Sequence, residues 1–208
     1  MRAVIAALIL AAASATAQAQ DGKGYVGFGA GIGNYPDLCS QTPPGLSCDD
    51  SPFAWKFFAG YMFLPYIGIE GGFNDFGAAN TQGVLLNPPA GTVPLPSNAD
   101  VYTQVWSLSL VGRIPLGPVA IMGRVGYGSV MSKISGLAQV QDTTTGAITT
   151  YDASTRGTSG QVIYGAGFSW DFLGSWTARL DWDHSKGDDG TNPKYDVDMY
   201  TLGIAYRF

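Results

Sequence analysis

The sequence predicts an all-β protein, an eight-stranded antiparallel up-and-down transmembrane β-barrel. Eight segments alternate large apolar residues with small or polar ones, at the two-residue period of a strand. The connections between these segments alternate between short and long, as they do in outer-membrane barrels. The last segment is an apolar strand that runs to Phe208. In an open sheet this strand would expose unpaired backbone N–H and C=O groups that promote aggregation, whereas a closed barrel has no edge strand.

The start of the chain has the pattern of a secretory signal peptide. Arg2 precedes an apolar stretch, and Ala17 and Ala19 supply the small-residue spacing of a cleavage site. The stretch is too short to cross about 30 Å of hydrocarbon as an anchoring helix. We therefore expect residues 1–19 to be a signal peptide and residues 20–208 to form the barrel as one domain.

The composition suits an outer surface that faces lipid. Only 13% of the residues are charged, while the chain contains 29 glycines and many aromatic residues. So few charges are unusual for a soluble surface and natural for a barrel in a bilayer. The formal net charge of −5 argues against nucleic acid as a partner.

The eight predicted strands each carry large apolar side chains on one face and small or polar side chains on the other. The apolar face is expected to contact lipid, with aromatic residues toward the strand ends as an interfacial girdle. In chain order the strands are Gly24–Asn34, Phe53–Leu64, Tyr66–Phe76, Val101–Ile114, Val119–Met131, Gln161–Asp171, Ser175–His184 and Met199–Phe208.

The opposite face is rich in glycine for a physical reason. An eight-stranded barrel has an interior just wide enough for side chains to fill. Small residues leave room there for a few long polar ones, so we expect the lumen to be a packed polar core. The inward residues include Gly27, Gly29, Gly31, Lys56, Gly60, Gly68, Glu70, Ser109, Arg113, Arg124, Gly126, Gly165, Gly167, Ser169, Arg179, Asp181 and Asp183.

The connection lengths separate this architecture from two alternatives. Short turns on one rim and long polar loops on the other indicate an outer-membrane barrel with periplasmic termini. A soluble sandwich need not alternate its connection lengths, and a lipocalin-like barrel would turn its apolar face inward. The tight connections follow the second, fourth and sixth strands, and the expected loops are 35–52, 77–100, 132–160 and 185–198.

Five motifs then resemble a known family in their order and spacing: Ala59-Gly-Tyr61, Pro65-Tyr66-x-Gly68-x-Glu70-x-Gly72-Phe73, Arg124-Val-Gly126-Tyr127, Ala178-Arg179-Leu180-Asp181-Trp182 and Leu202-Gly203-x-x-Tyr206-Arg-Phe208. Together they resemble the OmpA-like transmembrane domain family over roughly residues 22–208. The resemblance implies a small outer-membrane barrel. Since the chain ends with the last strand, we expect the family's separate peptidoglycan-binding domain to be missing.

The resemblance also implies a set of ion pairs inside the lumen. In the family, a Glu on the third strand pairs with basic residues and is discussed as a gate. The matching residues here are Glu70, Arg124 and Arg179, with Asp181 on the same inner face. An unpaired buried charge is costly, so we expect these residues to form an ion-pair network. Because Ser169 replaces the Glu of the family's second inner pair, we expect a structural polar core rather than a gate.

Cys39 and Cys48 are the only cysteines, and they lie nine residues apart in a loop rich in Pro and Gly. Behind a signal peptide, the compartment is oxidising and favours a disulfide. Two ligands alone rarely make a metal site, so we expect a disulfide, no metal and no cofactor.

The C-terminal residues Ile204, Tyr206 and Phe208 look like the sorting signal that the barrel-assembly machinery recognises. An ordinary lipid-facing strand explains the same pattern, and the two interpretations are compatible. We therefore expect that machinery to be a partner during biogenesis.

Three functional classes remain open. For an enzyme, His184 and Ser185 with Asp181 and Asp183 are the only cluster with a nucleophile, a base and carboxylates, but adjacent strand residues point to opposite faces. The His-x-Ser-Asn pattern of the lipid A deacylase is also missing. For a channel, eight strands leave no permanent bore, although weak conductance stays open.

The third class, a structural or surface-interaction protein, is the one we expect. Outer-membrane lipid, lipopolysaccharide and an extracellular ligand bound by the long loops are the expected partners. The Asp-rich loop at Asp188, Asp189, Asp196 and Asp198 lacks the alternating spacing of a calcium loop, so solvated charge is expected there. We expect an integral outer-membrane protein with no catalytic activity, whose alternatives are a lipid A-modifying enzyme and a weak small-solute channel.

Overall fold

A computed structural model describes most of the chain beyond its first residues. The described residues are 24–36, 38–39, 46–83, 89–95, 97–152, 154–187 and 195–208. The predicted signal peptide, residues 1–19, lies outside them, as do Asp188 and Asp189. No helix within the described ranges is long and apolar enough to cross a membrane.

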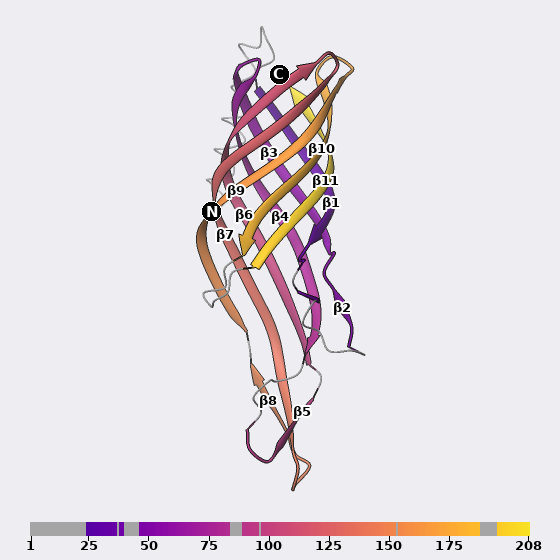
Figure 1. Ribbon diagram of the computed structural model, residues 1–208, viewed down its shortest axis with the longest axis vertical. Coiled ribbons are helices and arrows are strands. Elements are labelled where there is room, and N and C mark those ends of the chain that lie inside the picture. Colours follow the sequence, from indigo (N-terminus) through magenta and orange to yellow (C-terminus); the bar gives the residue numbers. More distant parts are fainter. Residues whose placement is uncertain are drawn as a thin grey trace, which may run out of the picture.

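Eight antiparallel strands close into a ring, which confirms the predicted fold class (Figure 1). Each strand pairs with the next strand of the ring, and the last pairs with the first from Tyr25–Arg207 to Asn34–Asp198. The final apolar strand is therefore the closing seam. The ring consists of β1 (Gly24–Asn34), β3 (Phe53–Leu64), β4 (Ile67–Gly83), β6 (Ser97–Leu116), β7 (Val119–Asp142), β9 (Thr155–Phe172), β10 (Trp176–Gly187) and β11 (Tyr195–Arg207).

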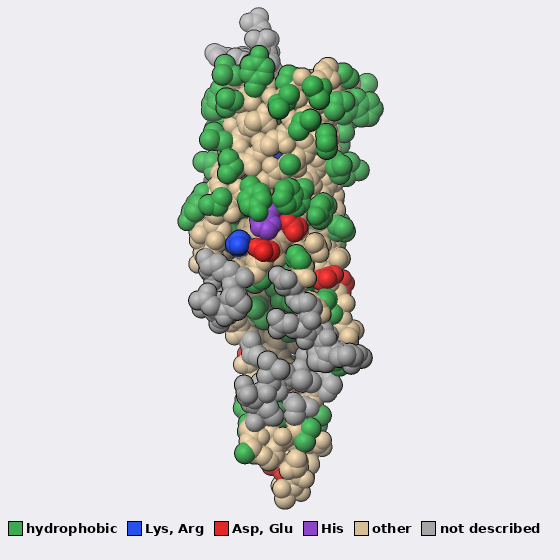
Figure 2. Space-filling view, viewed as in Figure 1, with side chains coloured by type: hydrophobic (Ala, Val, Ile, Leu, Met, Phe, Trp, Pro, Cys, Tyr) green, Lys and Arg blue, Asp and Glu red, His purple; other side chains and the backbone are tan. Residues whose placement is uncertain are grey.

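The outer wall carries the apolar face, as the alternation predicts. Leu108, Trp170 and Leu202 are more than half exposed, while their strand neighbours point inward. On the face shown in Figure 2, hydrophobic side chains spread across the half of the barrel that ends at the short turns. An apolar belt of this kind is stable only against hydrocarbon, because no soluble partner covers a whole barrel circumference.

The long loops are a correction to the sequence prediction. Much of 77–100 and 132–160 is strand, because β4, β6, β7 and β9 continue past the apolar band. Two short strands, β5 (Thr92–Leu95) and β8 (Ile148–Asp152), pair with the end of β7 in a separate small sheet. We call this region the extension; it projects from the loop end of the barrel (Figure 1). Past the apolar band no lipid requires an apolar outer face on these strands, so their sequences lack the apolar alternation that predicts a strand.

An irregularity in β4 also hides the strand period. The register between β4 and β6 shifts between Asp75 and Ala78, and Gly77 has a φ of 82°. Such a bulge changes the face of the residues that follow it, so Ala79 rather than Ala78 points into the lumen. Phe76 keeps the inward phase of Glu70 and is 1% exposed. Tyr35 OH donates a hydrogen bond of 3.0 Å to the Gly77 carbonyl oxygen and so fixes the bulge from inside.

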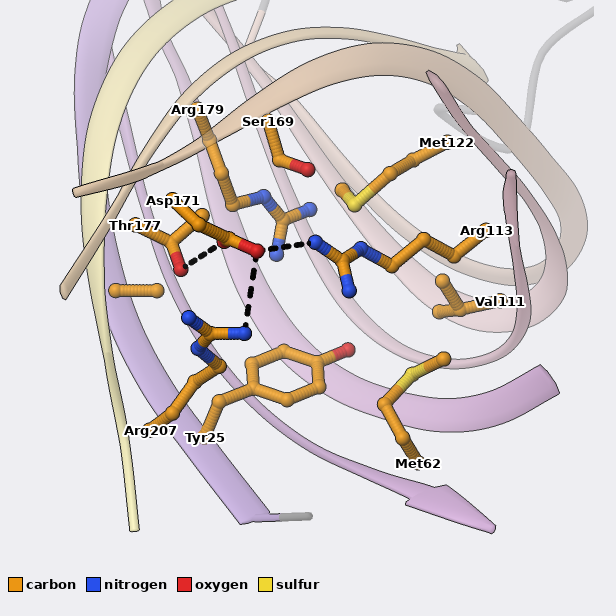
Figure 3. Close-up of a pocket in the computed structure, with 11 residues that line it drawn as sticks. Tyr25, Met62, Val111, Arg113, Met122, Ser169, Asp171, Thr177, Arg179 and Arg207 are labelled. Carbon is orange, nitrogen blue, oxygen red and sulfur yellow. Dashed lines mark hydrogen bonds and ion pairs between the residues drawn. The ribbon is translucent and has the colours of Figure 1, made fainter. Parts of the chain in front are cut away.

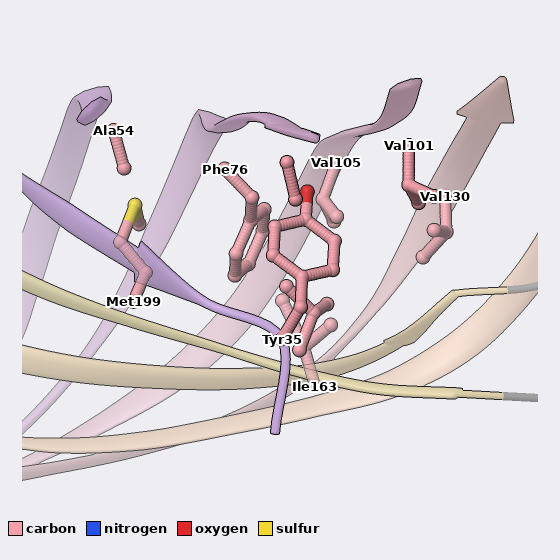
Figure 4. Packing of buried hydrophobic residues seen from close by; sticks show 10 residues of the cluster. Tyr35, Ala54, Phe76, Val101, Val105, Val130, Ile163 and Met199 are labelled. Atoms are coloured by element: carbon pink, nitrogen blue, oxygen red, sulfur yellow. The ribbon is translucent and has the colours of Figure 1, made fainter. Parts of the chain in front are cut away.

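The half of the lumen near the loop end is apolar, which corrects the expectation of a polar lumen throughout. We call this cluster the apolar layer, and Figure 4 shows Tyr35 and Phe76 at its centre. Water-filled volume beside these side chains would cost hydrophobic free energy, so the layer closes the lumen by packing. The apolar layer consists of Tyr35, Ala54, Phe76, Ala79, Val101, Val105, Val130, Ile163, Val197 and Met199.

Inward and outward glycines of the same strand differ in the space around them. A Cβ on inward Gly126 would collide with the Leu108 carbonyl oxygen and with Ser109, whereas a Cβ on outward Gly123 would have no atom within 4 Å. The narrow ring therefore requires glycine at Gly126 and not at Gly123.

This contrast makes a stability prediction. Gly126→Ala should lower the free energy of unfolding by about 1–3 kcal/mol, because the added methyl overpacks the inner wall. Gly123→Ala, three residues away on the same strand, should leave it unchanged or raise it by less than about 1 kcal/mol. Denaturant unfolding in lipid vesicles, followed by tryptophan fluorescence, measures both. Equal effects of the two variants would contradict the crowding of the inner wall.

Candidate functional site

Six charged side chains meet inside the barrel, on the turn-end side of the apolar layer. We call them the charged layer; its three cations and three anions balance. They come from β3, β4, β7 and β10, where strand alternation turns each of them inward. The charged layer consists of Lys56, Glu70, Arg124, Arg179, Asp181 and Asp183.

Glu70 accepts three contacts from three different strands. Arg179 Nη1 donates to Oε2 at 2.6 Å, and Tyr25 OH donates to the same oxygen at 3.0 Å. Arg124 Nη1 lies 3.3 Å from Oε1. In the ring, three strands separate β4 from β10 in either direction, so the Glu70–Arg179 pair joins opposite walls of the barrel. Glu70 is 6% exposed and Arg179 is 3% exposed.

The two aspartates of β10 hold the remaining cations. Lys56 Nζ lies 2.8 Å from Asp181 Oδ2 and 2.8 Å from Asp183 Oδ2. Arg124 bridges the same pair, with Nε 2.6 Å from Asp183 Oδ1 and Nη2 3.2 Å from Asp181 Oδ1. Arg179 Nε also lies 3.1 Å from Asp181 Oδ2. Every carboxylate therefore contacts at least two cations, as low dielectric surroundings demand.

The structure brings together the four residues predicted for the lumen network and adds two. Lys56 and Asp183 were expected to point inward, but not to join the network. Strand alternation could have identified both, because each points to the inner face of its own strand. Phe58, which is also inward, lies under the Arg179 guanidinium at 4.1 Å from the ring centroid. Its ring fills the space beside the charges and adds a cation–π contact.

A smaller polar cluster closes the turn end of the lumen. Asp171 accepts from Arg113 Nη2 at 2.6 Å, from Arg207 Nη1 at 3.2 Å and from Thr177 Oγ1 at 2.8 Å. Figure 3 shows the two guanidinium groups converging on this carboxylate. The cavity beside them, which Ser169 also lines, holds about 50 Å³, so it is a void of one or two waters rather than a bore.

The candidate catalytic pair is split by the wall of the barrel. Since β10 continues through Gly187, His184 lies on the outer face and Ser185 lies inside, where it is 1% exposed. His184 Nδ1 is 2.9 Å from Asp198 Oδ1, and Figure 2 shows the imidazole at the lower edge of the hydrophobic band. The hydroxyl and the imidazole therefore cannot meet.

The structure contains the expected disulfide between Cys39 and Cys48, with the Cα atoms 5.7 Å apart. Cys48 belongs to β2 (Cys48–Asp49), which pairs with Asn80 and Thr81 of β4, so the crosslink ties the first loop to the barrel wall. Within the described ranges, no group of three or more His, Cys, Asp or Glu residues could hold a metal ion.

The predicted assembly signal lies on the closing seam. Ile204 and Tyr206 are exposed on the outer wall, and Phe208 N donates to the Gly24 carbonyl oxygen at 2.9 Å. The side chains are thus placed as a lipid-facing strand requires. Recognition by the assembly machinery stays a prediction.

The tip of the extension is held by one carboxylate. Asp142 Oδ1 accepts from the backbone N–H groups of Thr145 at 2.7 Å and Thr144 at 2.8 Å. These donors hold the pKa of Asp142 below its usual range. Thr143 Oγ1 donates to the Gly91 carbonyl oxygen at 2.9 Å, which ties the tip to the β5 segment.

The fold and the lumen define a class: an integral transmembrane β-barrel whose interior is filled by side chains. A family model described as "Outer membrane protein beta-barrel domain" matches residues 3–208, and the chain belongs to this family. The protein is therefore located in the bacterial outer membrane. In barrels of this kind the short turns face the periplasm, so the extension faces outward.

Curated relatives and solved structures agree with this assignment. Outer membrane protein A of Salmonella typhi is 27% identical over 224 residues, and that of Shigella flexneri is 26% identical. Both alignments cover 99% of this chain and 55% of the relative, so the chain spans about half the length of these proteins.

Two solved barrels share the fold at low identity. Ail, the attachment invasion locus protein of Yersinia pestis, has a TM-score of 0.51 and 20% identity, covering 91% of this chain and 100% of that chain. Neisserial surface protein A has a TM-score of 0.52 and 14% identity, covering 90% of this chain and 98% of that chain.

The charged layer makes a stability prediction. Glu70→Gln should lower the free energy of unfolding by about 3–5 kcal/mol, because it leaves three buried cations to share the two carboxylates of Asp181 and Asp183. Denaturant unfolding in vesicles measures this loss. Lys186→Gln is the control, since the Lys186–Asp196 pair at 3.4 Å is exposed and should contribute at most about 1 kcal/mol. Equal stability of Glu70→Gln and the parent protein would show that the layer does not hold the walls.

The extension tip makes a pH prediction. Because the folded pKa of Asp142 is lowered, its stabilising contacts are fully present above the unfolded pKa of about 3.9 and are lost as the pH falls through the folded value. The amide shifts of Thr144 and Thr145 should therefore titrate together below that value. Asp142→Asn keeps an acceptor oxygen and should abolish the step. Titration at the pKa of a free aspartate would argue against the capped tip.

Proposed function

We propose that this protein is a non-enzymatic outer-membrane barrel that acts in surface interaction, with the barrel as a rigid anchor. The extension is the observation that carries this proposal. Building two added strands and lengthened ring strands outside the membrane serves no purpose in spanning a bilayer, for which about 9–11 tilted residues per strand suffice. β7 alone comprises 24 residues. A raised, ordered sheet presents side chains away from the lipopolysaccharide surface, as a binding surface requires.

The filled lumen favours an anchor over a channel. An ion entering from the periplasm meets the Asp171 cluster, then the balanced charges around Glu70, and then the apolar layer. The apolar layer would have to open for conduction, because an ion inside it would lose its hydration. The split between His184 and Ser185 likewise gives no support to a hydrolase.

The extension offers a polar hollow for a ligand. It has a volume of about 500 Å³, and its lining includes Asp100 of β6, Ser135 and Gln139 of β7, Asp152 of β8, and Ser154 between β8 and β9. One structure of the Ail protein, 19% identical with a TM-score of 0.50, is a complex with the heparin analogue sucrose octasulfate. Carboxylates in the hollow here would repel such a polyanion, so a neutral or basic ligand suits this surface better.

Removing the extension tests the proposal. Cells that display the protein should bind to wells coated with a neutral or basic extracellular-matrix protein, and binding should fall to the empty-vector level when Gln139–Thr150 is replaced by Asn-Gly. This two-residue turn closes the pair Ala138–Tyr151 as a hairpin. The barrel should remain folded, because its ring lies below the cut, and heat-modifiable migration on gels checks this.

Leu173→Asn is the matched control on the opposite rim. Leu173 is exposed in a short turn with a φ of 48°, which Asn tolerates, so binding should be unchanged. Binding that survives removal of the extension would contradict a surface-interaction role for it. A change in lipid A acylation that depends on His184 would instead favour the enzyme alternative.

A further inference from the structure

Two cations lie side by side on the outer wall with no carboxylate partner among the residues that the structure describes. Lys133 of β7 and Arg156 of β9 are directly opposite in the ladder, and both are exposed. Like charges in this position repel, so the pair destabilises the bare sheet. Every other Lys or Arg within the described ranges lies within 4 Å of a carboxylate. These paired cations are Lys56, Arg113, Arg124, Arg179, Lys186 and Arg207.

The pair lies just outside the apolar band, on its extracellular side. On β7 the lipid-facing positions continue from Tyr127 through Ser129 and Met131 to Lys133, since alternate residues share a face. β9 follows the same course from Val162 to Arg156. This level corresponds to the headgroups of the outer leaflet.

A groove in the outer wall begins two lipid-facing positions below the pair, at Ser129 and Gly160. It measures about 630 Å³, and its lining includes Phe57, Gly71, Phe73, Trp106 and Tyr127. Phe57, Phe73, Trp106, Ser129 and Gly160 form one continuous register row across five strands, so the groove runs from β3 to the strands that carry the cations.

The floor of the groove is open because residue 71 is a glycine. A Cβ on Gly71 would meet no atom closer than 3.7 Å, so the barrel itself does not require glycine there. The rim beside it is rigid, because the rings of Phe73 and Trp106 pack with centroids 4.7 Å apart. The hollow therefore persists, and in the hydrocarbon region only an acyl chain or another apolar surface can fill it.

We propose that Lys133 and Arg156 bind a phosphate group of lipopolysaccharide, and that an acyl chain of the same molecule lies in the groove. A phosphate between the two side chains would cancel their repulsion, with Arg156 able to donate two parallel hydrogen bonds. A cation pair continuous with an apolar groove matches an amphiphile that has an anionic headgroup, whereas a soluble anion would leave the groove unused. The site depends only on the outer-membrane location and goes beyond the proposed role of the extension.

The test measures binding of bisphosphorylated lipid A to the purified, folded barrel in detergent micelles. In Lys133→Gln/Arg156→Gln the affinity should fall at least about tenfold, since each interfacial cation contributes about 1 kcal/mol. Lys186→Gln removes an exposed cation that Asp196 already pairs, and its affinity should stay within about twofold of the parent protein. Gly71→Leu fills the groove and should weaken binding while leaving the phosphate dependence intact.

Four outcomes would overturn the proposal. Unchanged affinity in the double variant would remove the cation pair from the site, and equal binding of dephosphorylated lipid A would remove the phosphate. Equal affinity for phosphatidylglycerol would make the site a general one for anionic lipids. A crosslinked dimer across the groove that Gly71→Leu abolishes would make a second copy the occupant. Heat-modifiable migration confirms that each variant is folded, and replacing Gln139–Thr150 by Asn-Gly, which leaves Lys133 and Arg156 in place, should not affect lipid A binding.

Discussion

The narrow lumen of a closed eight-stranded ring is the constraint on which the rest of this structure depends. Its volume is fixed by the strand number, so every inward side chain must fit and every inward charge must find a partner within it. Glycines line the inner wall where a Cβ would strike the neighbouring strand, as at Gly126. The space so released holds three cations and three anions that neutralise one another.

The same constraint divides the lumen into two layers with different physics. Near the periplasm, the contacts of Glu70 with Arg179 and of Asp183 with Arg124 and Lys56 link β3, β4, β7 and β10 across the interior. Toward the loop end of the barrel, Tyr35 and the side chains around it close the lumen by packing. The charged layer links strands across the lumen through ion pairs, and the apolar layer excludes water from it. A wall fixed in both ways is a stiff support for the sheet that projects from it.

Strand alternation made the barrel predictable, because lipid imposes an apolar face on each strand wherever it contacts the wall. The same alternation predicts that Glu70 and Arg179 point inward. The identity of the ion pairs was less accessible, since Lys56 and Asp183 differ from other inward residues only in their height within the lumen. That height depends on strand tilt and register, which one strand's sequence does not contain.

The sequence did not predict the extension or the apolar layer, because the two-residue alternation of apolar residues is lost in both. Outside the membrane both faces of β7 meet water or another strand, so the residues beyond Met131 lack a period of two in hydrophobicity. The bulge at Gly77 shifts the period of β4 after Phe76, so that Ala79 rather than Ala78 points inward. Val105 lies beside lipid-facing Trp106, and adjacent apolar residues with opposite orientations conceal the alternation that identified the other strands.

A double-mutant cycle between Glu70 and Arg179 tests most directly whether charges across the lumen hold the barrel together. The free energies of unfolding of the parent, Glu70→Gln, Arg179→Met and the double variant would be measured in the same vesicles. The account predicts a coupling energy in the upper part of the range for contacting residues, about 1.5–3 kcal/mol. Additive effects, with a coupling below about 0.5 kcal/mol, would contradict it.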